Sequence, residues 1–255
     1  MHIDGQHRHL VRVAVLAHGS GSTAEFARRA FAGALAAEGV ATVAIDDRSG
    51  DVSQVADRLG RVVDAFAAGR ATQVWVGGVS LGAHAAAVVA ASRPWLHGVL
   101  IAMPAWTGPA AEVAGRSAAA ARDLRRDGLA PTLDRLSAAG WVGEELARAW
   151  PSYGLPQLVA ALEATSRSAG PTPAQLSAIE PPTGLYATPD DPFHPVEVAA
   201  LWARLIPRSH ALVQRVDPAE GALALGRQTL RAWHRAAVDS PFGPVGGVGG
   251  DPAVA

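Results

Sequence analysis

The chain has 255 residues, 49% of them hydrophobic, with a formal net charge of −1 and no cysteine. This length allows one domain with a sizeable core. The near-zero net charge gives no electrostatic reason to expect a nucleic acid or a membrane surface as a partner. The absence of cysteine excludes disulfides, thiolate nucleophiles and cysteine-based metal sites.

Two kinds of targeting segment are missing from the sequence pattern. Residues 1–12 are polar and contain several histidines, so they lack the apolar stretch of a signal peptide. No apolar run reaches the ~20 residues of a membrane-spanning helix without charges or Pro/Gly breaks. We therefore expect a cytoplasmic protein with a small molecule, and neither a membrane nor a nucleic acid, as its partner.

Strand-like and helix-like patterns alternate along the first hundred residues. Such alternation predicts an α/β fold with a mostly parallel sheet and helices on both faces. The predicted strands are 11–17, 40–45, 73–76 and 96–102, and the predicted helices are 23–38, 52–68 and 81–92.

The strand pattern stops after residue 103 and resumes at 183. Between them lie helical segments that glycine and proline interrupt repeatedly, which predicts an inserted helical cap over 104–180. The core is thus expected to comprise 1–103 and 181–237, and the Pro/Gly-rich end, 238–255, to be a disordered tail. The later predicted strands are 183–187 and 211–216, and the later helices are 196–205 and 219–237.

The segment Gly78-Val79-Ser80-Leu81-Gly82 lies between a predicted strand and a predicted helix. Small residues allow a sharp turn there, which would lift the hydroxyl of Ser80 clear of the sheet. The helix start also leaves backbone N–H groups without intrahelical partners, and these can face a developing oxyanion. The pattern G-x-S-x-G between strand and helix is typical of a nucleophile elbow.

This elbow, together with two other loops, resembles the α/β-hydrolase family. The stretch Ala17-His18-Gly19-Ser20 is similar to the family's His-Gly oxyanion motif, and Thr188-Pro189-Asp190-Asp191-Pro192-Phe193-His194 is similar to its acid loop. The resemblance implies that the N–H groups of Ser20 and Leu81 form the oxyanion hole. It implies Asp191 as the catalytic acid, with Asp190 as the close alternative. An aspartate that merely caps the following helix is the structural alternative.

The family's catalytic histidine follows the last strand, but residues 212–221 contain no histidine. Two histidines are expected at the correct edge of the sheet: His194 on the acid loop, and His18 beside the oxyanion loop. A carboxylate with a raised pKa, from Asp217 or Glu220, is a third possibility. The fourth is that the site has no general base.

The remaining histidines of the predicted core are interpreted as structural. His84 lies one turn into the elbow helix, which is normally buried, so a packed and hydrogen-bonded side chain is expected. His97 and His210 begin strands and His234 lies deep in the last helix, far from the C-terminal edge of the sheet.

The aromatic residues of the predicted cap, above all Trp106, are candidates for the wall of an acyl pocket. The structural alternative is that such rings only pack the helices together. The other candidate pocket residues are Trp141, Trp150 and Tyr153.

From the elbow and the two loops we expect a serine hydrolase that cleaves a small or medium ester, thioester or related acyl compound through an acyl-enzyme on Ser80. No cofactor or metal is implied. The alternatives are a non-hydrolytic protein of the same fold, which binds a ligand or acts as a cyclase or isomerase, and a biosynthetic acyltransferase or thioesterase. The oligomeric state is left open.

Overall fold

A six-stranded parallel sheet forms the centre of the computed structural model, which describes residues 11–238 apart from 70, 111, 138–139, 190, 192 and 218. The predicted tail therefore lies, from residue 239 on, outside the described residues. The strand order is β2-β1-β3-β4-β5-β6, with every neighbouring pair parallel. This confirms the expected parallel sheet. The strands are β1 (Val11–Ala17), β2 (Ala41–Ile45), β3 (Ala71–Val79), β4 (Gly98–Ala102), β5 (Thr183–Ala187) and β6 (Ser209–Val213).

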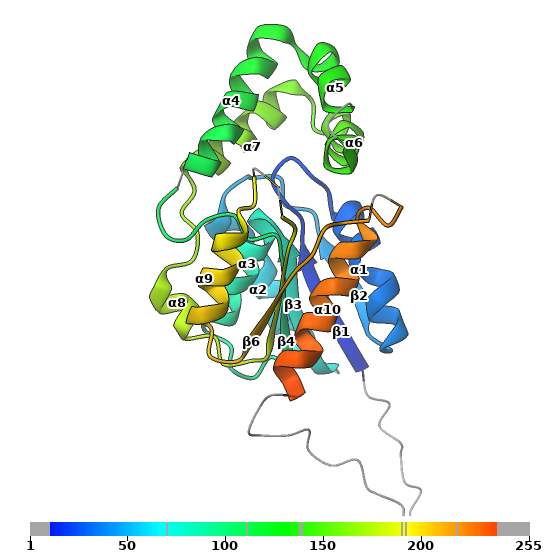
Figure 1. Ribbon diagram of the computed structural model, residues 1–255, viewed down its shortest axis with the longest axis vertical. Coiled ribbons are helices and arrows are strands. Elements are labelled where there is room, and N and C mark those ends of the chain that lie inside the picture. Colours follow the sequence, from blue (N-terminus) through cyan, green and yellow to red (C-terminus); the bar gives the residue numbers. More distant parts are fainter. Residues whose placement is uncertain are drawn as a thin grey trace, which may run out of the picture.

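Helices cover both faces of the sheet, as the alternating pattern predicts (Figure 1). Helices α1 (Ala24–Ala37) and α10 (Leu223–Val238) pack on one face. Helices α2 (Val52–Ala68), α3 (Leu81–Ala90) and α9 (Val196–Leu205) pack on the other. Strands β4 and β5 are buried along their whole length because both faces are covered. No helix within the described ranges is both long and apolar enough to span a membrane.

Most of residues 104–180 form a helical layer above the C-terminal ends of the strands (Figure 1). These helices have an apolar cluster of their own. The last short helix of the insertion, α8 (Pro173–Ser177), instead packs against α3 and α9, on the side of the core. The layer itself, called the cap below, consists of α4 (Glu112–Asp127), α5 (Leu129–Ser137), α6 (Gly140–Ala149), the 3-10 turn η1 (Trp150–Ser152) and α7 (Leu155–Arg167).

Two predicted boundaries near the C-terminal end of the core differ from the structure. Strand β6 occupies 209–213 rather than 211–216 because it pairs with all five residues of β5, from Thr183↔Ser209 to Ala187↔Val213. Helix α10 begins at Leu223 rather than at residue 219. A turn precedes it, in which the carbonyl of Asp217 accepts the N–H groups of Glu220 and Gly221.

Candidate active site

Ser80 stands at a sharp turn between β3 and α3. Its backbone has φ 55° and ψ −119°, a conformation that residues with a side chain rarely adopt. Two hydrogen bonds hold the turn: the N–H of Ser80 donates to the carbonyl of Ala102 at 2.9 Å, and the N–H of His84 donates to the carbonyl of Ser80 at 3.1 Å. A strained backbone of this kind costs on the order of 1–3 kcal/mol. The strand–turn–helix geometry expected of G-x-S-x-G is therefore present.

Glycines make this turn possible because neighbouring backbone comes too close for a side chain. A Cβ on Gly78 would lie 2.4 Å from the carbonyl carbon of Gly82, and one on Gly82 would lie 2.3 Å from the oxygen of Ala17. The loop after β1 also approaches the serine closely, since a Cβ on Gly19 would lie 3.2 Å from that of Ser80. The loop after β1, which the sequence predicts as the oxyanion loop, is thus in direct contact with the elbow.

The loop after β1 is fastened to the cap beside Ser80. The hydroxyls of Ser20 and Thr165, a residue of α7, lie 2.6 Å apart. The single hydroxyl proton of Thr165 faces two carbonyl oxygens, those of Gly50 at 3.1 Å and Ala161 at 3.0 Å. Because carbonyl oxygens only accept, Ser20 is the donor in its bond to Thr165. Leu81, the first residue of α3, presents an N–H of the kind that lacks an intrahelical partner.

Asp191 and His194 form a hydrogen-bonded pair on the loop between β5 and α9. Imidazole Nδ1 lies 2.8 Å from Asp191 Oδ2, and Oδ1 accepts the N–H of Phe193 at 2.7 Å. Burial opposes ionisation of Asp191, but the bonds from the His194 ring and from the backbone of Phe193 and His194 together hold its pKa below the usual value. An ionised carboxylate only accepts, so the proton of the neutral imidazole is on Nδ1. The lone pair is then on Nε2.

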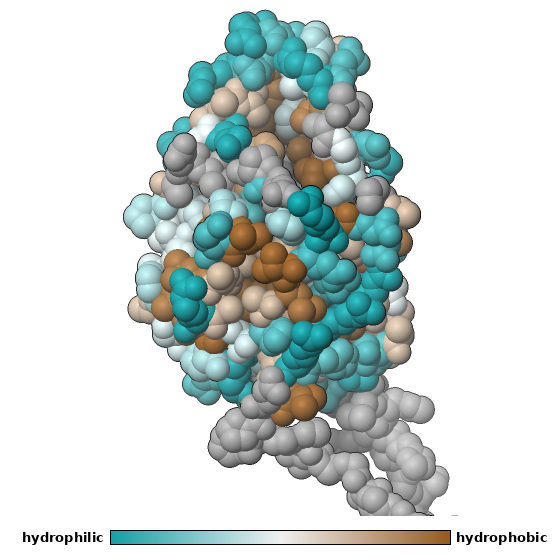
Figure 2. Space-filling view, in the orientation of Figure 1, coloured by the Kyte–Doolittle hydropathy of each residue, from teal (hydrophilic) through white to brown (hydrophobic). Residues whose placement is uncertain are grey.

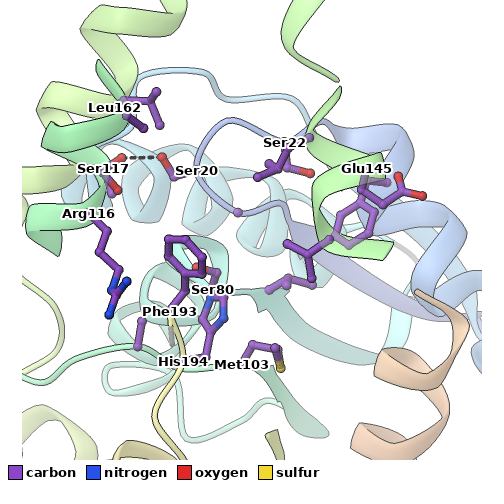
Figure 3. A pocket seen from close by; sticks show the side chains of 18 of the residues that line it. Ser20, Ser22, Ser80, Met103, Arg116, Ser117, Glu145, Leu162, Phe193 and His194 are labelled. Atoms are coloured by element: carbon purple, nitrogen blue, oxygen red, sulfur yellow. Dashed lines mark hydrogen bonds between the residues drawn. The ribbon is translucent and has the colours of Figure 1, made fainter. Parts of the chain in front are cut away.

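Ser80 and His194 line the same cavity between the core and the cap (Figure 3). The cavity holds about 190 Å³, and Gly19, Ser20 and Trp106 also line it. Its remaining wall is largely apolar, and Figure 2 shows hydrophobic side chains gathered in the hollow beneath the top of the cap. The structure thus brings the predicted nucleophile, the oxyanion loop and one of the candidate bases together at one place.

The other candidate rings of the cap divide into two groups. Trp141 and Trp150 line the cavity, as does Trp106. Tyr153 does not: its hydroxyl donates to the carbonyl of Ser22 at 2.6 Å and so ties η1 to the oxyanion loop. This tyrosine therefore joins the cap to the core.

His18 is buried at the start of the loop after β1 and is not part of the cavity wall. Its Nδ1 lies 2.8 Å from the carbonyl of Gly19, and its Nε2 lies 3.4 Å from Asp46 Oδ1. Burial lowers the pKa of His18, and the hydrogen bond to Gly19 and the charge of Asp46 only partly oppose this. These contacts hold the loop, and His18 does not line the cavity that contains Ser80.

The carboxylates at the usual position of the catalytic histidine make other contacts. Glu220 forms an ion pair with Arg227, and Asp217 Oδ1 accepts the N–H of Ala219 at 2.9 Å. Neither of them lines the cavity that contains Ser80. The close alternative to Asp191, Asp190, lies outside the described residues.

His84 is a fully buried core residue, as expected from its place in the elbow helix. Its Nε2 accepts the N–H of Ala105 at 2.9 Å, and its ring packs edge-on against Trp106. Burial lowers the pKa of His84 to about 3, and the nearby His194 adds to the lowering. The folded protein therefore keeps His84 neutral over the whole physiological range.

Because His84 is buried in its neutral form, we expect the free energy of unfolding to fall in acid. The unfolded chain binds a proton at His84 below about pH 6.5, whereas the folded chain does so only below about pH 3. Stability should therefore fall by roughly 1.4 kcal/mol per pH unit, from this group alone, as pH decreases through that window. Urea unfolding of wild type and His84→Gln between pH 7 and 4 measures the difference in slope. Parallel curves for the two proteins would contradict the prediction.

Several cavity residues were not predicted from the sequence. Met103 has a positive φ of 58° at the end of β4, next to the elbow. Arg116 and Glu145 reach the cavity from α4 and α6, and Thr165 reaches it from α7. No sequence motif marks the residues from the helices above the sheet, because their position depends on how these helices fold over it. Within the described part of the chain, no three His, Asp or Glu side chains are grouped so that they could hold a metal ion.

Comparisons with known proteins agree on the architecture. No family model matches the chain, and no curated protein matches it in sequence. Among solved structures, a thermophilic esterase from Thermogutta terrifontis is 18% identical with a TM-score of 0.64, over 89% of this chain and 90% of that one. The enol-lactonase from Burkholderia xenovorans LB400 is 15% identical with a TM-score of 0.63, over 92% and 93%.

A third similar structure is MenH from S. aureus, 16% identical with a TM-score of 0.62, over 89% of this chain and 92% of that one. At such identities the likeness concerns the fold. This chain has the α/β-hydrolase fold.

Proposed function

We propose that this protein is a serine hydrolase that cleaves small or medium esters, thioesters or related acyl compounds through an acyl-enzyme on Ser80. The observation that carries the proposal is the shared cavity: Ser80 and the imidazole of His194, itself bonded to Asp191, line one largely apolar space. In this assignment the three residues act as nucleophile, general base and orienting acid. The histidine comes from the acid loop instead of the loop after β6.

Acylation begins when Ser80 Oγ attacks the substrate carbonyl carbon and its proton passes to His194 Nε2. The carbonyl oxygen becomes an oxyanion, which the N–H groups of Ser20 and Leu81 stabilise. One such donor is worth about 3 kcal/mol of transition-state stabilisation. His194 then gives its proton to the leaving oxygen or sulfur as the bond to carbon breaks. An alcohol or thiol departs, and the acyl group remains on Ser80.

Deacylation repeats these steps with water as the nucleophile. Water loses a proton to His194 and attacks the acyl carbon, and the oxyanion occupies the same N–H groups. Collapse breaks the bond to Ser80 Oγ, which takes the proton back from His194. The products are a carboxylic acid and the free enzyme. Asp191 stays ionised throughout and favours the imidazolium that forms at each step.

The solved structures of similar fold support a hydrolytic reaction, since an esterase and an enol-lactonase are among them. The non-hydrolytic alternative drew its support from the missing histidine after the last strand. The position of His194 in the cavity weighs against that alternative. No observation favours an acyl acceptor other than water.

Covalent labelling tests the proposal directly. Wild type, Ser80→Ala and His194→Ala are treated with a fluorophosphonate and weighed as intact proteins. We expect one adduct on wild type, none on Ser80→Ala, and labelling of His194→Ala that is slower by a factor on the order of 10² or more. A folded wild type that takes no adduct would overturn the acyl-enzyme mechanism. Equal labelling of His194→Ala and wild type would remove His194 from its role.

Thr165 is expected to act as a positioning residue for the oxyanion hole. Its hydroxyl holds the side chain of Ser20, so Thr165→Val should let that loop relax while the shape of the cavity is kept. We expect kcat to fall by roughly tenfold with little change in KM, because the oxyanion is present only during the reaction. Ser166→Ala is the matched control, since that hydroxyl donates within α7, to the carbonyl of Glu163. A KM effect without a kcat effect would contradict the prediction.

A further inference from the structure

The cavity around Ser80 has two charged side chains from the cap, and they differ in their surroundings. Glu145 is paired with Arg29 and Arg148, so two guanidinium groups neutralise its carboxylate. Arg116 extends from α4 along the cavity (Figure 3). Among the side chains that the structure describes, no carboxylate forms an ion pair with Arg116. The cavity therefore has one positive charge without a counterion from the described protein.

The contact that Arg116 makes leaves its hydrogen-bond donors available. Its guanidinium carbon lies 5.4 Å above the ring centre of Phe193. Such a cation–π contact involves the positive charge and uses none of the five guanidinium N–H groups as hydrogen-bond donors to a carboxylate. The Phe193 ring is in turn 6.5 Å from that of His194. The contact thus places the guanidinium close to the ring that neighbours the imidazole, with its N–H groups free of any carboxylate of the described residues.

A planar guanidinium without a carboxylate partner can bind one through two parallel hydrogen bonds. The space between this group and Ser80 is lined mostly by apolar side chains, so a matching substrate has a hydrocarbon segment there. We propose that Arg116 selects acyl substrates that have a carboxylate at the end remote from the scissile carbonyl. The inference rests on the proposed hydrolytic function and specifies the substrate class of the same site.

Hydrolysis of matched esters tests this selection. The probes are the mono-p-nitrophenyl ester of adipic acid, whose far end is a carboxylate, and the same compound with that end methylated. We expect wild type to prefer the anionic ester by roughly tenfold in kcat/KM, mainly through a lower KM. Arg116→Met should abolish the preference, and Arg116→Lys should retain part of it. Arg122→Met, which removes an exposed charge of the same helix away from the cavity, should leave it unchanged.

Binding to Ser80→Ala separates this inference from the proposed function. Calorimetric titration compares monomethyl adipate with dimethyl adipate in Ser80→Ala, with and without Arg116→Met. Tighter binding of the monoester that disappears with Arg116→Met supports the inference, even where wild type cleaves neither ester and the hydrolase proposal fails. Two results would overturn the inference and leave the hydrolase proposal intact. One is a ratio of kcat/KM between the two esters that is the same in wild type and Arg116→Met. The other is equal affinity of Ser80→Ala for the two adipates.

Discussion

Replacing Ser80 with alanine is expected to lower kcat by a factor on the order of 10⁴–10⁶, with KM nearly unchanged. The change removes one oxygen and so abolishes the acyl-enzyme, while the cavity wall and the N–H groups of Ser20 and Leu81 stay in place. Steady-state hydrolysis of a chromogenic ester measures the loss. Residual turnover within tenfold of wild type, after contaminating esterase is excluded, would show that Ser80 is not the nucleophile.

A glycine at the same position separates catalysis from folding. Ser80 has φ 55°, a conformation that glycine adopts without strain. Ser80→Gly should therefore be as inactive as Ser80→Ala, yet more stable than Ser80→Ala by about 1 kcal/mol. Urea unfolding of the two variants measures this difference. A less stable glycine variant would mean that the turn is not strained at this residue.

Replacing His194 with alanine is expected to lower kcat by a factor on the order of 10³–10⁵, because Ser80 then loses the group that takes its proton. Added imidazole should restore part of the activity by entering the space that the side chain leaves. Asp191→Asn should give a smaller loss, since the imidazole remains but its orientation and charge stabilisation are weakened. Hydrolysis rates of the three proteins, with and without imidazole, measure these effects.

Matched controls address the other candidate bases. Asp217→Asn and Glu220→Gln remove the carboxylates that follow β6, and each should change kcat by less than about threefold because neither lines the cavity. A large loss in either variant, together with an active His194→Ala, would place the general base after β6. That result would match the usual location in the family and refute the assignment of His194.

The elements of the core could be predicted because their signals are local. Helices over 52–68 and 196–205 match the predicted bounds, and Gly78, Ser80 and Gly82 predicted a turn that the backbone confirms. For the edge strand β6, the sequence pattern predicts a start at residue 211, two residues after the observed start at Ser209. Its side chains are only half-buried, so hydrophobicity does not mark its ends; the pairing with β5 does.

The arrangement of the site depended on contacts that no local pattern encodes. The burial of His84 could be expected from its helix, but the distance of His18 from the cavity depends on which way its side chain turns beneath the loop. Likewise, the sequence places His194 on the loop after β5 but does not show that its ring would line the cavity. The contributions of Arg116 and Thr165 required the cap to be folded over the sheet.

The Asp191–His194 pair is contained in a single loop, three residues apart, after the buried strand β5. On the proposed assignment, one short loop therefore supplies both the general base and the acid that orients it. The edge strand β6 supplies neither. On this assignment, the loop between β6 and α10 supplies no catalytic residue. It is the natural place in the core for insertions, fusions or the new termini of a circularly permuted enzyme.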